Sequence, residues 1–207
     1  MKNSWIWFLK AWAPSTPSPW CDVLNADVMD MMEYREDLKQ FWTSGHGHEI
    51  NSQVACFTLR DVLDNFRDVI AQKPSTEKAI LYFSHSGMVL KLLAALDLFK
   101  DDQHIKCDEM MSNRKWSTSR IDPFGSNVAF VLTQCGSGIG DSTTFEVGLM
   151  VNERFVKIPG CHQEGDWCNF QTFEALFSDV VDSSNCNFET MCSTNVRSVD
   201  VDDDSMF

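Results

Sequence analysis

The chain has 207 residues, which is enough for one domain with a sizeable core and some irregular additions. Its formal net charge of −13 argues against nucleic-acid binding and against an anionic membrane surface. The same charge suits a polyanionic substrate poorly, unless local basic residues overcome the global field. Because the chain lacks a run of about 18 apolar residues, we expect no transmembrane helix.

The N-terminus has the outline of a secretory signal peptide. Lys2 supplies a positive start, residues 5–9 form an apolar core, and residues 11–13 read as an A-x-A-like cleavage site. The apolar core is short for this role, and Lys10 interrupts it. Cleavage and retention of this segment therefore both stay open.

The cysteine pattern bears on the redox compartment. No C-x-x-C pair occurs, which disfavours a zinc ribbon or a thioredoxin-type motif. An even number of cysteines spread along an acidic chain favours an oxidising compartment, although reduced buried thiols remain an alternative. Cys186 and Cys192 are close enough to predict a local disulfide that closes a small loop. The eight residues are Cys21, Cys56, Cys107, Cys135, Cys161, Cys168, Cys186 and Cys192.

Hydrophobic periodicity predicts the first elements in chain order. Apolar residues at helical spacing indicate a helix over residues 26–42 and a second helix over 58–71. The segment 45–53 between them, GHGHEINSQ, is predicted to be a loop. An apolar run at 79–83 predicts a buried strand, and a helical pattern follows it directly.

The second half of the chain alternates polar and apolar segments. Residues 101–119 are polar and predicted to be irregular. Strands are expected at 127–132, 144–151 and 155–158, the last two as a hairpin around residues 152–153. A final helix is predicted over residues 170–181.

The sequence Ser84-His85-Ser86-Gly87 joins the predicted strand 79–83 to the helix after it. The N–H groups and the dipole at a helix N-terminus favour anions, and an imidazole there can contribute. Ligands of open α/β sheets also bind at the carboxyl ends of strands. His85 is therefore a candidate anion ligand, with a helix cap or a satisfied buried histidine as the alternative.

Two further motifs are weaker candidates. His46 and His48 have an H-x-H spacing beside Glu49, but a metal site needs further ligands, and a polar loop is the favoured interpretation. Residues 136–140, GSGIG, look like a phosphate-binding loop, yet a strand pattern follows them. Because no helix N-terminus is then available, a hairpin connection is favoured.

An ordered set of segments resembles the multiple inositol polyphosphate phosphatases of the histidine acid phosphatase group. The matching stretches are SPWC at 18–21, EYREDLKQFW at 33–42, GHGHEINSQ at 45–53, LYFSHSG at 81–87, LLAALDLFKDD at 92–102, NRK at 113–115, SNVAFVL at 126–132 and LMVNERFVKIPGC at 149–161.

The resemblance implies hydrolysis of phosphomonoesters of inositol polyphosphates, phytate included, through a phosphohistidine and without a metal or cofactor. The nucleophile belongs to an R-H-G-x-R-x-P motif, and these 207 residues contain no Arg-His-Gly. His85 matches the histidine of the late H-A-E motif, which binds the phosphoryl group. Gly87 stands where that motif has its proton donor. The chain is thus expected to lack both chemical roles and to be inactive as given.

The resemblance also implies a partial α/β histidine-phosphatase fold of three layers with an incomplete central sheet. In this resemblance, residues 18–192 correspond to the C-terminal portion of the histidine acid phosphatase domain. Residues 1–17 are then an N-terminal extension, and residues 193–207 are an acidic disordered tail. The strand at 80–83 would then present an unpaired apolar edge, through which the chain could associate with itself. The family location is the endoplasmic reticulum lumen or the exterior of the cell.

Overall fold

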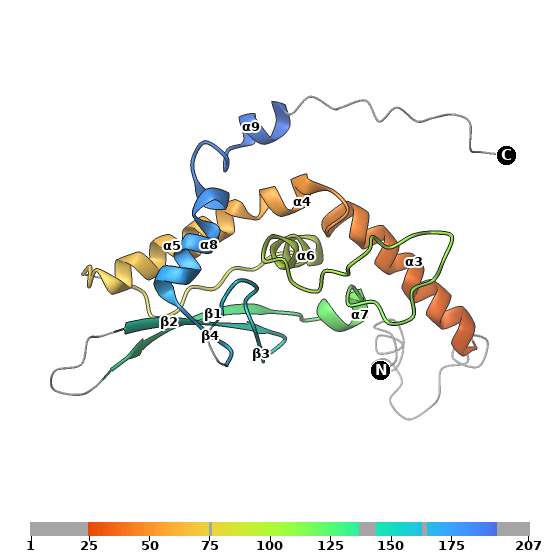
Figure 1. The fold of residues 1–207 in the computed structure, drawn as a ribbon, viewed down its shortest axis with the longest axis horizontal. Helices are drawn as coiled ribbons and strands as arrows, with labels where there is room; N and C mark the ends of the chain where they lie inside the picture. Colours follow the sequence, from red (N-terminus) through yellow and green to blue (C-terminus); the bar gives the residue numbers. More distant parts are fainter. Residues whose placement is uncertain (1–24, 75, 137–143, 163–164, 194–207) are drawn as a thin grey trace.

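The computed structural model describes residues 25–74, 76–136, 144–162 and 165–193. The expectations for residues 1–17 and for 194–207 lie outside the described residues. Figure 1 shows helices gathered on one side of a small twisted sheet, with the long helix of residues 26–44 extending beyond it. This arrangement confirms a mixed fold of helices and sheet, in which the sheet is open.

Two predicted helices of the first half are confirmed, and one predicted loop is wrong. The confirmed helices are α3 (Ala26–Ser44) and α5 (Cys56–Ile70). Between them, α4 (Glu49–Val54) occupies most of the segment expected to be a loop. The buried amide of Asn51 donates to the carbonyl oxygens of Trp42 (3.1 Å) and Gly45 (3.0 Å), which folds this segment back against the end of α3. Sequence periodicity does not reveal these hydrogen bonds of Asn51.

The prediction of a strand at residues 79–83 is wrong. These residues form no strand ladder in the structure, and Phe83 and Leu81 are 93% and 77% exposed. An apolar run becomes a buried strand only when a neighbouring strand and a covering layer are present. Here the chain runs directly into α6 (Ser86–Ala95), whose apolar residues do enter the core.

The sheet is antiparallel in every strand pair of the described residues. Its order is β1 (Val128–Cys135), β2 (Thr144–Val151) and β3 (Arg154–Val156), and β4 (Trp167–Asn169) also pairs with β2. The β2–β3 hairpin confirms the turn predicted around Asn152 and Glu153, which have φ angles of 50° and 64°. The short β4 was not predicted. The one-turn helix α7 (Thr118–Ile121) precedes β1.

The C-terminal part is tied to α5 by a disulfide. Helix α8 (Phe170–Val181) confirms the predicted helix and buries Phe173 and Phe177. After it, Cys186 pairs with Cys56 of α5, while a second disulfide joins Cys161 to Cys168. The predicted Cys186–Cys192 bridge is therefore wrong, and the Cys192 thiol is free and exposed. Cys192 lies in the short helix α9 (Phe188–Ser193), whereas Cys186 is buried against α5.

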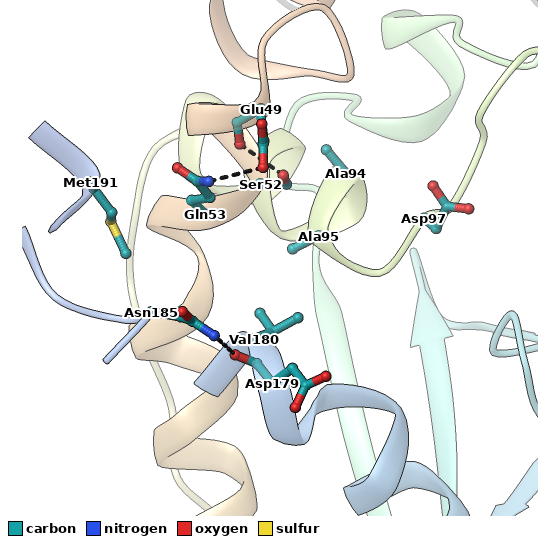
Figure 2. A pocket seen from close by; sticks show the side chains of 10 residues that line it. All are labelled: Glu49, Ser52, Gln53, Ala94, Ala95, Asp97, Asp179, Val180, Asn185 and Met191. Carbon is teal, nitrogen blue, oxygen red and sulfur yellow. Dashed lines mark hydrogen bonds between the residues drawn. The ribbon is translucent and has the colours of Figure 1, made fainter. Parts of the chain in front are cut away.

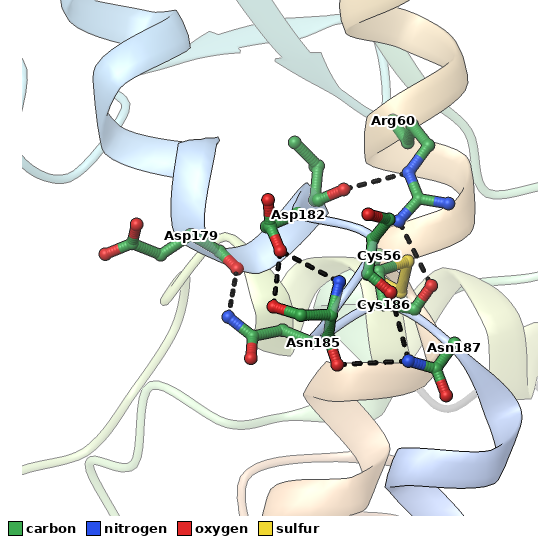
Figure 3. Close-up of a disulfide and its surroundings, with 10 residues drawn as sticks. Cys56, Arg60, Asp179, Asp182, Asn185, Cys186 and Asn187 are labelled. Carbon is green, nitrogen blue, oxygen red and sulfur yellow. Dashed lines mark hydrogen bonds between the residues drawn. A yellow bond between two sulfur atoms is a disulfide. The ribbon is translucent and has the colours of Figure 1, made fainter.

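Hydrogen bonds reinforce this junction, as Figure 3 shows. The guanidinium of Arg60 on α5 donates to the carbonyl oxygens of Val181 (2.8 Å) and Cys186 (3.0 Å). The bond to Val181 satisfies a carbonyl oxygen in the last turn of α8, where no further helical N–H group follows to donate to it. The chain reversal after α8 is held by both the covalent bond and this cation.

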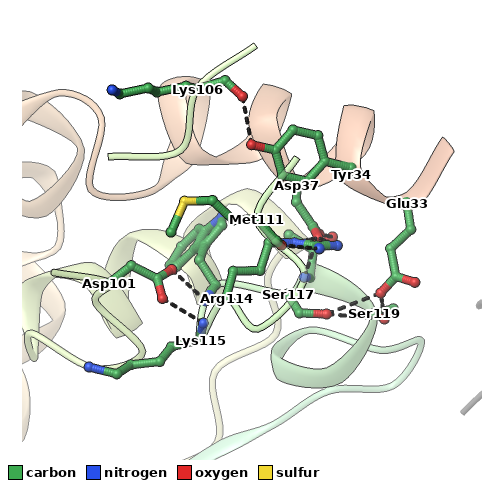
Figure 4. A network of polar contacts seen from close by, with 12 residues as sticks. Glu33, Tyr34, Asp37, Asp101, Lys106, Met111, Arg114, Lys115, Ser117 and Ser119 are labelled. Carbon is green, nitrogen blue, oxygen red and sulfur yellow. Dashed lines mark hydrogen bonds and ion pairs between the residues drawn. The ribbon is translucent and has the colours of Figure 1, made fainter. Parts of the chain in front are cut away.

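A buried ion pair fixes the polar segment 101–117 on α3 (Figure 4). The Arg114 guanidinium donates to the fully buried carboxylate of Asp37 through Nε at 2.6 Å and also through Nη2. Thr118 adds its N–H (2.7 Å) and its hydroxyl (2.6 Å) to the same carboxylate. Burial raises the pKa of Asp37, and the hydrogen bonds from Thr118 and Arg114 oppose that rise. The segment is irregular, as predicted, but it is anchored.

Within the described ranges, no helix has both the length and the apolar character needed to cross a bilayer.

Candidate phosphate site

His85 lies at the N-terminus of α6. It is the N-cap residue, with extended backbone (φ −104°, ψ 159°), and its carbonyl oxygen accepts from the N–H of Met88 (2.9 Å) and of Val89 (3.3 Å). Its side chain makes no capping hydrogen bond and is exposed, so His85 caps α6 through its backbone, and the alternative of a buried histidine does not hold. Among the described residues, no carbonyl oxygen accepts from the N–H groups of Ser86 and Gly87. These two groups are therefore available to an anion.

Gly87 is not required by packing. A Cβ atom built at this position would lie 3.4 Å from the Ser44 hydroxyl oxygen and 4.0 Å from Nζ of Lys91, both ordinary contacts. The same construction shows that the Lys91 ammonium lies beside the first turn of α6. Sequence reasoning missed Lys91, although residues four apart on a helix share one face. A cation at this point offsets the acidic net charge locally.

Asp122 is the second group that sequence reasoning missed. It follows α7, and its two carboxyl oxygens accept hydrogen bonds from the hydroxyls of Ser86 and Ser126. Burial raises the pKa of Asp122, and these two hydroxyl groups lower it by a smaller amount. No sequence signal links Asp122 to Ser86, because 36 residues separate them. The structure thus adds a carboxyl group next to Ser86, the residue that follows His85.

The other histidines do not gather at one point. His46 Nε2 lies 2.9 Å from the carbonyl oxygen of Leu98, and its ring packs edge-on against Trp116. Burial lowers the pKa of His46. The rings of His48 and His104 both lie against Trp42. In the described part of the chain, no three His, Cys, Asp or Glu residues come together as a metal site would require. Most of the GSGIG segment, residues 137–140, lies outside the described residues.

A cavity of the described residues lies at a different place. It has a volume of about 550 Å³ and lies where α4 and the end of α6 meet α8 and the residues after it (Figure 2). Glu49, Asp97 and Asp179 line it, and the Asp179 carbonyl oxygen accepts from the Asn185 amide. Three carboxylates would repel a polyphosphate, so this cavity does not compete with the α6 N-terminus as a phosphate site.

Comparisons with known proteins identify the family of the chain. The model of the histidine phosphatase superfamily (branch 2) matches residues 2–158. Multiple inositol polyphosphate phosphatase 1 of Homo sapiens is 30% identical over 172 residues, which cover 80% of this chain and 35% of that protein. Phytase A of Emericella nidulans is 24% identical over 162 residues, covering 70% of this chain and 34% of that protein. The chain therefore spans about a third of the length of these relatives.

Solved structures show the same fold. A crystal structure of the phytase from D. castellii superposes with a TM-score of 0.71 at 19% identity, covering 86% of this chain and 37% of the phytase. A crystal structure of the Bifidobacterium longum multiple inositol polyphosphate phosphatase in complex with phosphate gives a TM-score of 0.60 at 18% identity, over 79% of this chain and 34% of that one. The chain belongs to branch 2 of the histidine phosphatase superfamily.

Proposed function

We propose that this chain is the phosphate-binding, C-terminal portion of a histidine acid phosphatase of the inositol polyphosphate type. Its ligands are phosphomonoesters of inositol polyphosphates, phytate included. The observation that carries the proposal is the N-terminus of α6, where His85 and Lys91 accompany two free N–H groups. The human and fungal relatives, named for inositol polyphosphate phosphatase and phytase activity, support the substrate class.

The 207-residue chain is proposed to bind the phosphoryl group without releasing phosphate. It contains no Arg-His-Gly, so the covalent route through a phosphohistidine has no nucleophile in this sequence. Gly87 cannot protonate a leaving alcohol, and loss of a general acid lowers a rate about 10²–10⁴-fold. The free N–H groups and cations remain, and they favour a bound anion in the absence of turnover.

Incubation of the purified chain with phytate at acidic and neutral pH tests this function. We expect calorimetry to show binding and a phosphate assay to show no release. His85→Ala should weaken binding about 10-fold, because a charge-assisted hydrogen bond to the phosphoryl group is lost. His162→Ala, which removes another exposed histidine, is the matched control and should leave the affinity unchanged.

Two other results would count against the proposal. Phosphate release that His85→Ala abolishes would show that the chain is catalytically competent by itself. If the chain shows neither binding nor release, the proposal fails, and the interpretation that is left is a structural role without a ligand.

We also propose that the chain associates with a second copy through residues 80–83. These residues are apolar and exposed, and the Tyr82 hydroxyl donates to Asp61 on α5, which holds the segment at the surface. An exposed apolar patch of this kind is an association site in soluble proteins. The double substitution Leu81→Ser and Phe83→Ser should convert a dimer to a monomer in sedimentation velocity. The control Phe188→Ser removes a different exposed aromatic ring. If the wild-type chain is a monomer at all concentrations, the proposal is contradicted.

The proposed compartment is the endoplasmic reticulum lumen or the cell exterior. The two disulfides in the described residues support it, because such bonds persist in oxidising surroundings.

A further inference from the structure

We propose that Ser86 is a ligand of the phosphate site and that Asp122 is a positioning residue, whose protonation turns the Ser86 hydroxyl toward the bound anion. This inference rests on the function proposed above, since it concerns the same site. The ligand class is a phosphate or sulfate dianion. The family motif H-A-E that His85 matches has alanine at the position of Ser86, so this hydroxyl is not part of the shared pattern.

The geometry places Ser86 between the carboxyl group and the anion position. Ser86 is the first residue of α6, and its own N–H and that of Gly87 are free. Its hydroxyl bonds to one oxygen of Asp122, while Ser126 bonds to the other. Asp122 itself is tied to α7, because its N–H donates to the Thr118 carbonyl oxygen at 2.9 Å. The carboxyl group is therefore fixed, and the Ser86 hydroxyl is the part that can rotate.

The direction of the Ser86 hydroxyl depends on the charge of Asp122. An ionised carboxylate only accepts, so Ser86 must donate its hydrogen to it and presents lone pairs to an incoming anion. A protonated carboxyl group donates to the Ser86 oxygen instead. The Ser86 hydrogen is then free to donate to the anion, and one negative charge beside the site is gone.

The surroundings of Asp122 decide how readily it takes up this proton. Titratable and charged groups on the neighbouring elements include His85 at the N-cap of α6, Lys91 on α6, Arg120 on α7, Glu33 on α3, and the pair Glu153 and Arg154 at the β2–β3 turn. Asn152 connects that turn to α7 by donating to the Ile121 carbonyl oxygen (3.1 Å). None of these charged side chains contributes to the pKa shift of Asp122, which burial raises. Protonation therefore extends to a pH above the usual range of an aspartate.

Sulfate is the probe for the test, because its two charges do not change between about pH 5 and about pH 7. Calorimetry at constant ionic strength should show that wild-type affinity increases as the pH falls. Asp122→Asn carries no charge and can donate permanently to Ser86, so its affinity near pH 7 should exceed that of wild type about 10-fold. Ser86→Ala should lose affinity, by up to about 10-fold, as the pH falls and Asp122 takes up its proton, and should lose little near pH 7.

The controls separate this effect from a general loss of carboxylate charge and from misfolding. Wild type and Asp122→Asn both retain His85 and differ only in the side chain at position 122, so their pH profiles are compared directly. Asp182→Asn removes another carboxylate that bonds a serine, Ser184, at the end of α8, and it should follow the wild-type profile. Ser86→Ala removes only the hydroxyl group of the side chain. Thermal melts establish that each variant is folded.

The outcomes for the two proposals are distinct. Suppose that wild type binds sulfate and that both variants, Asp122→Asn and Ser86→Ala, reproduce its pH profile. The role proposed for these two residues is then overturned, while the phosphate site stands. If wild type binds neither sulfate nor phytate at any pH, the proposed function falls, and the inference falls with it.

Discussion

Replacing both Cys56 and Cys186 by alanine should lower the free energy of unfolding by about 5 kcal/mol. The bond closes a loop with a sequence separation of 130 residues, and the chain-entropy model assigns a larger loss of unfolded-state freedom to a longer loop. It also fastens the region after α8 to α5. Urea denaturation under non-reducing conditions, with the midpoint and slope fitted together, measures the change.

The second disulfide provides the control for loop length. Cys161 and Cys168 are only 7 residues apart, so their replacement by alanine should lower the free energy of unfolding by about 2.5 kcal/mol. All four cysteines are buried, which makes the packing change comparable. Equal losses for the two pairs would contradict the loop-entropy explanation.

Asp37→Ala should destabilise the protein by about 3–5 kcal/mol, because it leaves the Arg114 guanidinium buried without its anion. Asp37 is 0% exposed and Arg114 is 8% exposed, so water cannot replace the lost partner. The substitution also removes the acceptor of both Thr118 hydrogen bonds. Thermal melts followed by near-ultraviolet circular dichroism report the loss, since Trp116 lies next to this network in the sequence.

An exposed ion pair and a double variant serve as controls for this prediction. Glu174→Ala breaks the pair with Arg67 at the surface (2.7 Å) and should change stability by less than about 1 kcal/mol. Asp37→Leu combined with Arg114→Met removes both charges and should recover part of the loss. If Asp37→Ala melts at the same temperature as wild type, the Asp37–Arg114 pair contributes nothing to the free energy of unfolding.

Local periodicity was sufficient where the pattern extended over several turns. The helices Ala26–Ser44, Cys56–Ile70 and Phe170–Val181 were predicted within a few residues, because an amphipathic stripe at helical spacing buries one face whatever the partner is. The hairpin was predicted from residues 152–153, whose positive φ angles suit a tight turn between two strands.

Prediction failed where the structure depended on a distant partner. The apolar run at 79–83 has the composition of a buried strand, but no ladder forms there. Helix α4 depends on the contacts of Asn51 with the end of α3. Cys186 pairs with Cys56 rather than with the nearer Cys192. In each case the deciding contact joins residues that local pattern does not relate.

The sequence by itself determined the family, the main helices, and His85 as the anion-ligand candidate ahead of a helix. These features are local or ordered along the chain, so they can be read without coordinates. The tertiary structure alone decided the disulfide pairing, the position of Lys91 beside Gly87 and that of Asp122 beside Ser86. Packing of α6 against the segment after α7 brings Asp122 to Ser86 across 36 residues. A sequence pattern cannot contain that proximity, because it results from how the whole chain buries its apolar surface.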